Sequence, residues 1–180
     1  VNKGFGKAIN FLSKKVKTKY FLCTQADVNV KKKDILELKK VFIKNKSCII
    51  SVPKFNKNIN HKYSKLKIPI FETDSFIGSI FMCEKKKFLS INGFDENFFF
   101  YWEDIDLSER IKKSKYKIFL NQKSNPNHYF GKSSNIDFKN LLIKNINNKF
   151  GEYYYQYKYN KLKFIKVIRE PFVYTFRLIL

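Results

Sequence analysis

Short apolar runs alternate with amphipathic stretches along most of this chain, and the alternation predicts an α/β fold. The runs at 20–24 and 47–52 are β-prone and uninterrupted, as expected of strands that are covered on both faces. Between them, residues 31–45 carry Ile35, Leu38 and Phe42 at helical spacing. We therefore expect a mixed, mainly parallel sheet with helices on both faces, in which residues 20–24 form a central strand.

The remaining elements follow from the same patterns. Residues 71–83 have strand character around Gly78, residues 84–91 read as a short helix, and a longer helix begins near Glu103. Residues 115–120 alternate between polar and apolar positions, as an edge strand does. Residues 54–69 are polar and aperiodic, so we expect a loop there.

The chain is strongly basic and aromatic. It has 37 basic and 15 acidic side chains, a formal net charge of +22, and 18% aromatic residues. This balance is typical of proteins that bind nucleic acids or anionic membranes. Codon bias is the competing explanation, because the overused Lys, Asn, Ile, Phe and Tyr all have AT-rich codons.

Cysteine usage indicates a reducing, cytoplasmic location. Cys23, Cys48 and Cys83 lie far apart within apolar runs, and an odd count without a Cys-x-x-Cys pair argues against a disulfide framework. The sequence shows no signal peptide and no apolar run near the ~20 residues of a membrane span. Because the first residue is Val1 rather than Met, we expect a fragment that is inactive alone.

The candidate chemistry is concentrated in residues 91–110. Asn92-Gly93 predicts a turn, aromatic residues occupy 98–102, and Glu103-Asp104 stand at the start of a helix. Partial desolvation beside so many rings raises a carboxyl pKa, which suits a general base. The helix dipole lowers the pKa instead, so two capping acids are the alternative interpretation.

Several short motifs follow one another in a characteristic order, namely Gly78-Ser79-Ile80-Phe81-Met82, Asn92-Gly93-Phe94-Asp95-Glu96, Glu103-Asp104-Ile105-Asp106-Leu107-Ser108-Glu109-Arg110, His128 and Ser133. This order resembles the inverting glycosyltransferase family 2, and within it the rhamnosyltransferase-type branch. The resemblance covers roughly residues 2–134 and corresponds to the later part of that family's catalytic domain. It implies a GT-A-like (Rossmann-like) fold that lacks its first βα units, with the catalytic part at 1–136.

The resemblance also implies a reaction. A sugar would pass from a nucleotide-sugar donor to a hydroxyl of a saccharide or lipid-linked acceptor, with inversion, in cell-surface polysaccharide biosynthesis. Asp104 would be the general base, and Glu103 would position the acceptor or the base. Donor or acceptor contacts are implied for Asn10, Gln25, Gly78, Trp102, Arg110 and Ser133.

A metal site is expected where the strand 20–24 ends. Ligands of open α/β sheets lie beyond the carboxyl ends of strands, which is where Asp27 follows. The resemblance implies that Asp27 holds Mg²⁺ or Mn²⁺ on the donor diphosphate, with His128 as a second ligand. The chain departs from the family's Asp-x-Asp or Asn-Pro-Asp pattern, because Gln25 and Ala26 precede Asp27. A turn-capping Asp27 and a core-hydrogen-bonding His128 are the alternatives.

Residues 137–180 form a basic-aromatic tail that we expect to be helical. From 147 to 180, Tyr and Phe alternate with Lys and Arg, a composition typical of a segment lying on an anionic membrane surface, here its cytoplasmic face. A helical cap on the catalytic part, or the start of a longer C-terminal domain, is the alternative. The rival functions are a nucleic-acid-binding module, which leaves Glu103-Asp104 unexplained, and an inactive interaction piece.

Overall fold

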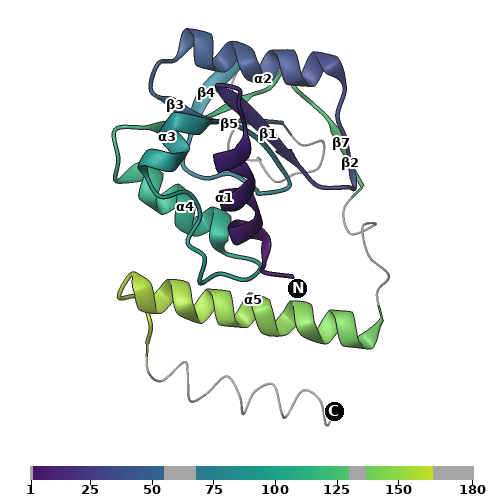
Figure 1. Cartoon of the computed structure of the whole chain (residues 1–180), viewed down its shortest axis with the longest axis vertical. Coiled ribbons are helices and arrows are strands. Elements are labelled where there is room, and N and C mark those ends of the chain that lie inside the picture. Colours follow the sequence, from purple (N-terminus) through teal and green to yellow (C-terminus); the bar gives the residue numbers. More distant parts are fainter. Residues whose placement is uncertain (1, 55–67, 130–136, 164–180) are drawn as a thin grey trace.

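A five-stranded sheet lies at the centre of the computed structural model, which describes residues 2–54, 68–129 and 137–163 (Figure 1). Its strands follow the order β1-β5-β3-β6-β4, and β2 pairs with β7 in a separate ribbon. The strands are β1 (Tyr20–Thr24), β2 (Val28–Asn29), β3 (Cys48–Pro53), β4 (Ile70–Thr73), β5 (Ile80–Glu84), β6 (Lys117–Asn121) and β7 (Asn127–His128). The helices are α1 (Phe5–Lys15), α2 (Lys32–Lys44), α3 (Lys85–Ser90), α4 (Glu103–Lys112) and α5 (Phe138–Lys158).

The sheet is mostly antiparallel, so the prediction of a mainly parallel sheet was wrong. β5 runs antiparallel to both β1 and β3, and β4 runs antiparallel to β6. Among the described strands of this sheet, β3 and β6 are the parallel pair. An uninterrupted apolar run reports only that a strand is covered on both faces, and helices on both sides cover antiparallel strands equally well.

Helices cover both faces of the sheet, as predicted. On one face, Phe81 of β5 and Ile118 of β6 pack in the same core as Phe88 of α3 and Leu107 of α4. On the other face, a second core joins the strands to α2, through Leu38, Val41, Phe42, Cys48 and Met82. In β6, for example, Ile118 and Leu120 pack in the first core and Phe119 between them packs against the second. The three cysteines are buried and free, as expected.

The positions of two strands were predicted the wrong way round. β1 lies at an edge of the described sheet and pairs with β5 alone, whereas β6 lies inside it between β3 and β4. The polar–apolar alternation of β6 arises because Ile118 and Leu120 face the larger core, while Lys117 remains exposed. The alternation therefore arose because the two faces of β6 differ in burial, and it did not indicate an edge strand. The predicted loop at 54–69 lies largely outside the described residues.

Helix α5 runs beneath α1 and α4 in the view of Figure 1 and is held against α4 by charge. Lys158 Nζ lies 2.6 Å from Oδ2 of Asp95 and 2.6 Å from Oδ1 of Asp106. Tyr159 donates its hydroxyl to the same Asp106 oxygen at 3.0 Å. Residues 138–158 therefore form a helical cap on the sheet domain. None of the described helices is long and apolar enough to cross a bilayer.

Candidate active site

The turn that delivers Glu103 and Asp104 is strained and is held by α5. Tyr101 and Trp102 have φ angles of 72° and 71°, in the left-handed region that non-glycine residues seldom occupy. Such a conformation costs roughly 1–2 kcal/mol per residue, so neighbouring structure must hold it in place. The Trp102 indole N–H donates to Oδ1 of Asn148 at 2.9 Å, and Gly151 lies directly against the Trp102 ring.

Asp104 is a partly buried carboxylate with two backbone partners. Its Oδ2 accepts a hydrogen bond from the Gly78 N–H at 2.9 Å, and its Oδ1 accepts one from the Ile105 N–H at 2.8 Å. Burial raises the pKa of Asp104 above its ordinary value, and the two backbone N–H groups offset part of that increase. A carboxylate held in this way is oriented and is more basic than one in water.

Glu103 is buried, and its pKa is raised as well. Glu103 is only 6% exposed, and its Oε2 has no hydrogen-bond partner within the described residues. Burial, followed by repulsion from the Asp104 charge, raises the pKa of Glu103 to about 7. Burial therefore favours the protonated form of both neighbouring acids, and repulsion from Asp104 adds to the effect at Glu103.

The structure brings Asp27 and His128 together, as the predicted metal site requires. Val28 and His128 face each other across the β2–β7 ribbon, and the Tyr129 N–H donates to the Asp27 carbonyl at 2.9 Å. Oδ1 of Asp27 lies 3.5 Å from Nε2 of His128. One carboxylate and one imidazole in this arrangement suit a divalent cation as part of its ligand set. Within the described residues, no three His, Cys, Asp or Glu side chains gather into a larger metal cluster.

Two backbone hydrogen bonds connect this pair with Asp104. The Gln25 N–H donates to the Ser79 carbonyl at 2.9 Å, and the adjacent Gly78 N–H reaches Asp104. The end of β1 and the beginning of β5 therefore meet at residues 78–79. The candidate base and the candidate metal ligands are both anchored at this one end of the sheet.

Three predicted contact residues have structural partners. The Asn10 amide donates to the Phe94 carbonyl and accepts from the Phe94 N–H, both at 2.9 Å. Arg110 binds the Asp106 carboxylate and the Ile91 and Gly93 carbonyls. Trp102 supports the turn described above. These contacts account for all three side chains through the fold, and their donor or acceptor contacts stay predictions.

The other predicted residues differ in how close they lie to Asp104. Gly78 contacts it directly, and Gln25 connects to it through Ser79. Ser133 lies outside the described residues. Sequence reasoning missed Lys158, which joins Asp95 to Asp106, because no local pattern reports an ion pair between residues so far apart.

Comparison with known proteins supports a glycosyltransferase fold. Residues 57–132 match the family profile described as the N-terminal domain of galactosyltransferase. The structure of GalNAc-T7 with UDP, GalNAc and Mn²⁺ aligns with a TM-score of 0.58 at 15% identity, covering 70% of this chain and 30% of that one. The fold is the GT-A fold. The structure of the mannosyltransferase PcManGT from Pyrobaculum calidifontis in complex with GDP-Man and Mn²⁺ aligns with a TM-score of 0.56 at 14% identity, covering 72% of this chain and 37% of that one.

This GT-A domain spans about a third of the length of either solved relative. A search of the curated proteins found no match. The predicted α/β, GT-A-like architecture is confirmed in its coarse form, and its predicted strand direction is corrected as described above.

Proposed function

We propose that this chain forms part of an inverting glycosyltransferase that moves a sugar from a nucleotide-sugar donor to an acceptor hydroxyl. One observation carries the proposal. Gly78 and Ser79 connect Asp104 by backbone hydrogen bonds to the turn at Gln25, and that turn leads to Asp27, which lies beside His128. A base and a metal-binding pair at one end of a GT-A sheet supply the two functions that the reaction requires.

Asp104 is the general base in this proposal. Its carboxylate takes the proton of the acceptor hydroxyl as that oxygen bonds to the anomeric carbon of the donor. The bond from this carbon to the diphosphate breaks on the opposite side, so a single displacement inverts the configuration. The raised pKa of Asp104 favours proton uptake, and positioned bases of this type contribute roughly 10²–10⁴-fold to rate.

Glu103 acts beside the base rather than in its place. With a pKa of about 7, it keeps its proton through the acidic range. A protonated carboxyl group donates a hydrogen bond, which a carboxylate does not. We therefore assign Glu103 the positioning of the acceptor hydroxyl or of the base.

Asp27 and His128 would hold Mg²⁺ or Mn²⁺. Their oxygen and nitrogen donors, 3.5 Å apart, fit one edge of such an ion's shell, and donor phosphate oxygens with water would complete it. The ion, when bound, offsets negative charge on the departing diphosphate. Both solved GT-A relatives were determined with Mn²⁺, which supports this choice.

The identities of donor and acceptor follow from weaker observations. The solved relatives contain UDP with GalNAc in one case and GDP-Man in the other, which supports a nucleotide-sugar donor here. The motif order of residues 78–133 supports family 2 and a rhamnosyl- or hexosyl-type transfer to a saccharide or lipid-linked acceptor in cell-surface polysaccharide biosynthesis.

The deciding experiment replaces Asp104 by Asn in the complete protein. Transfer from UDP- and GDP-sugars should fall roughly 10²–10⁴-fold, while the affinity for the donor nucleotide stays unchanged. Asn keeps the shape of the side chain and its hydrogen bond from Gly78, so the fold should survive. Normal turnover in a folded Asp104→Asn protein would show that Asp104 is not the general base.

A peripheral position on an anionic membrane surface is the second element of the proposal. Helix α5 exposes a stripe of apolar residues at helical spacing, namely Phe138, Leu142, Ile146, Phe150 and Tyr157. Amphipathic helices of a strongly basic chain bind anionic bilayers through such a face. This surface would place the site near a lipid-linked acceptor. Residues 164–180, the rest of the predicted membrane segment, lie outside the described part of the chain.

A further inference from the structure

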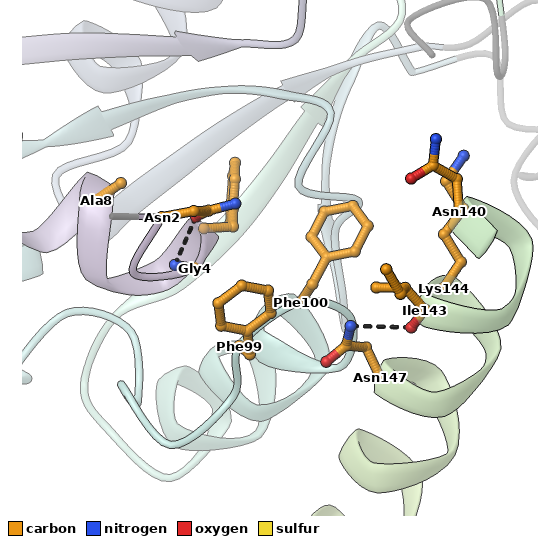
Figure 2. A pocket seen from close by; sticks show the side chains of 10 residues that line it. Asn2, Gly4, Ala8, Phe99, Phe100, Asn140, Ile143, Lys144 and Asn147 are labelled. Carbon is orange, nitrogen blue, oxygen red and sulfur yellow. Dashed lines mark hydrogen bonds between the residues drawn. The ribbon is translucent and has the colours of Figure 1, made fainter. Parts of the chain in front are cut away.

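A cavity of about 440 Å³ lies between the start of α1, the aromatic segment before α4, and the first half of α5 (Figure 2). Its volume is within the range of small-molecule sites in proteins. Figure 2 shows the rings of Phe99 and Phe100 on one side and the side chains of Asn140 and Lys144 on the facing helix. None of the lining residues is among those assigned to the donor, the metal or the base.

The aromatic side of the cavity is fixed by close backbone packing. The Phe5 N–H donates to the Phe99 carbonyl at 3.0 Å. Gly4 has a φ of 89°, and a Cβ atom there would approach the Phe99 carbonyl oxygen to 2.5 Å, so only glycine fits without rearrangement. Phe99 nevertheless remains 39% exposed, although burying a phenyl ring is favourable. The fold therefore holds this ring in place at the cavity rather than in the core.

The cavity adjoins Asp104 through two residues. Phe5, which lines the cavity, lies 3.5 Å from the position that a Cβ atom on Gly78 would occupy. The same position lies 3.6 Å from Oδ2 of Asp104. A molecule seated against Phe5 is thus one side-chain layer away from the base.

The cavity walls combine two chemistries. Phe5, Phe99 and Phe100 supply apolar ring surface, whereas Asn2, Asn140 and Asn147 supply amide groups. Amides both donate and accept hydrogen bonds, as sugar hydroxyls require. A pyranose ring has an apolar C–H face and a rim of hydroxyls, so it matches both walls. A nucleoside diphosphate matches poorly, because Lys144 is the one cationic side chain among the described lining residues.

We propose that this cavity is an outer acceptor subsite, which binds the sugar ring next to the reacting one, with its C–H face on Phe99 and its hydroxyls toward the amides of α5. The inference rests on the proposed function, since the bound sugar belongs to the acceptor whose hydroxyl Asp104 deprotonates. Helix α5 then supplies a wall of the substrate site in addition to holding the turn at Trp102.

Saturation-transfer NMR on the complete protein tests the assignment with methyl glycosides of glucose, galactose, mannose and rhamnose. At least one glycoside should receive saturation at its ring C–H protons. Phe99→Ala should weaken that signal at least tenfold, and Ala8→Phe should do the same by filling the cavity from the exposed surface of α1. Phe11→Ala is the matched control, because Phe11 is 62% exposed on α1 and does not line the cavity.

The outcomes separate this inference from the proposed function. Unchanged glycoside signals in both cavity variants, or no signal from any glycoside, would overturn the subsite. Binding of farnesyl phosphate in the cavity without glycoside binding would also overturn it, since the cavity would then hold a lipid chain. Slow hydrolysis of the nucleotide-sugar by water reports the donor site separately. If hydrolysis persists while glycosides bind elsewhere, the subsite is wrong and the transferase proposal stands; if no nucleotide-sugar is bound or cleaved, the proposed function is wrong.

Discussion

The backbone N–H of Gly78 donates a 2.9 Å hydrogen bond to Oδ2 of Asp104, joining the start of β5 to the first turn of α4. The residue at 78 therefore influences both the orientation of the carboxylate and the space in front of it. Its φ lies outside the left-handed region, and a Cβ atom there would meet its neighbours at ordinary contact distances of 3.5 Å or more.

Gly78→Ala should separate stability from activity. Because the added methyl group fits, we expect the free energy of unfolding to change by less than about 1 kcal/mol. The methyl group would stand beside the carboxylate, where the acceptor hydroxyl must approach, and kcat should fall by about 10²-fold. Chemical denaturation and steady-state kinetics measure the two effects. Unchanged kcat would show that the acceptor approaches Asp104 from another side.

Glu103 should make the protein less stable as pH rises. Its folded-state pKa of about 7 is above the ordinary value of 4.5, so the fold prefers the protonated form. Stability from this group is complete below pH 4.5, declines between 4.5 and 7, and stays reduced above 7, by on the order of 3 kcal/mol. Glu103→Gln should therefore be more stable than the wild type at pH 8 and nearly equal at pH 4. Denaturation curves at both pH values test this; a gain that is the same at both would contradict it.

Donor binding should depend on a divalent cation. We expect UDP or GDP to bind the complete protein with Mn²⁺ at least tenfold more tightly than in excess EDTA, because the ion bridges the diphosphate to the protein. Asp27→Asn should remove most of that difference, whereas Glu109→Gln, which alters a surface pair with Lys112, should not. Isothermal titration calorimetry measures the affinities. Equal affinity with and without metal would reject the site. A weak metal dependence would be explained by Gln25, which is uncharged where the family's Asp-x-Asp pattern has an acidic residue.

Lys158 should matter far more for stability than an exposed lysine. Its partner Asp106 is fully buried, and without Lys158 the Asp106 Oδ1 keeps the Tyr159 hydroxyl while Arg110 still pairs with Oδ2. Lys158→Met should therefore cost roughly 2 kcal/mol, the loss of a charge-assisted hydrogen bond to a buried carboxylate. Lys7→Met, which breaks a pair with Glu96 that is about half exposed on both sides, should cost less than about 1 kcal/mol. Urea denaturation compares them, and similar losses would mean that α5 contributes little through this contact.

The exposed apolar stripe of α5 should bind anionic vesicles. Sedimentation with phosphatidylserine-containing liposomes should bring down the protein at low salt, and much less with neutral liposomes or at high salt. Ile146→Glu, at the centre of the exposed stripe, should abolish sedimentation without affecting folding, because this side chain is 58% exposed. Phe11→Glu on α1 is the control. If the protein binds neither kind of liposome, the proposed membrane contact of α5 is wrong.

Local sequence patterns predicted much of the fold. The bounds of β1, α2 and β3 and the start of α4 agree with the patterns, because each depends on residues close in sequence. Strand direction was mispredicted, since coverage of both faces carries no information on direction. The proximity of Asp27 to His128 was anticipated only through the motif order.

What the sequence could not indicate depends on distant partners or unusual backbone. The left-handed φ angles of Tyr101 and Trp102 contradict their residue types and are supported from α5 through Asn148 and Gly151. The composition of residues 137–180 predicted a basic-aromatic helix. It did not indicate that Lys158 binds Asp95 and Asp106.

Gly151 gives α5 a single register. A Cβ atom at this position would approach the Trp102 ring and the Tyr101 carbonyl oxygen to 2.9 Å, so no side chain fits where the helix crosses the turn. Sliding the helix by one residue would bring Phe150 or Glu152 to the crossing point, and either would push the helix away. The absence of a side chain at residue 151 thus fixes the position of α5 along its axis. In this register Lys158, two turns further on, comes within reach of both Asp95 and Asp106.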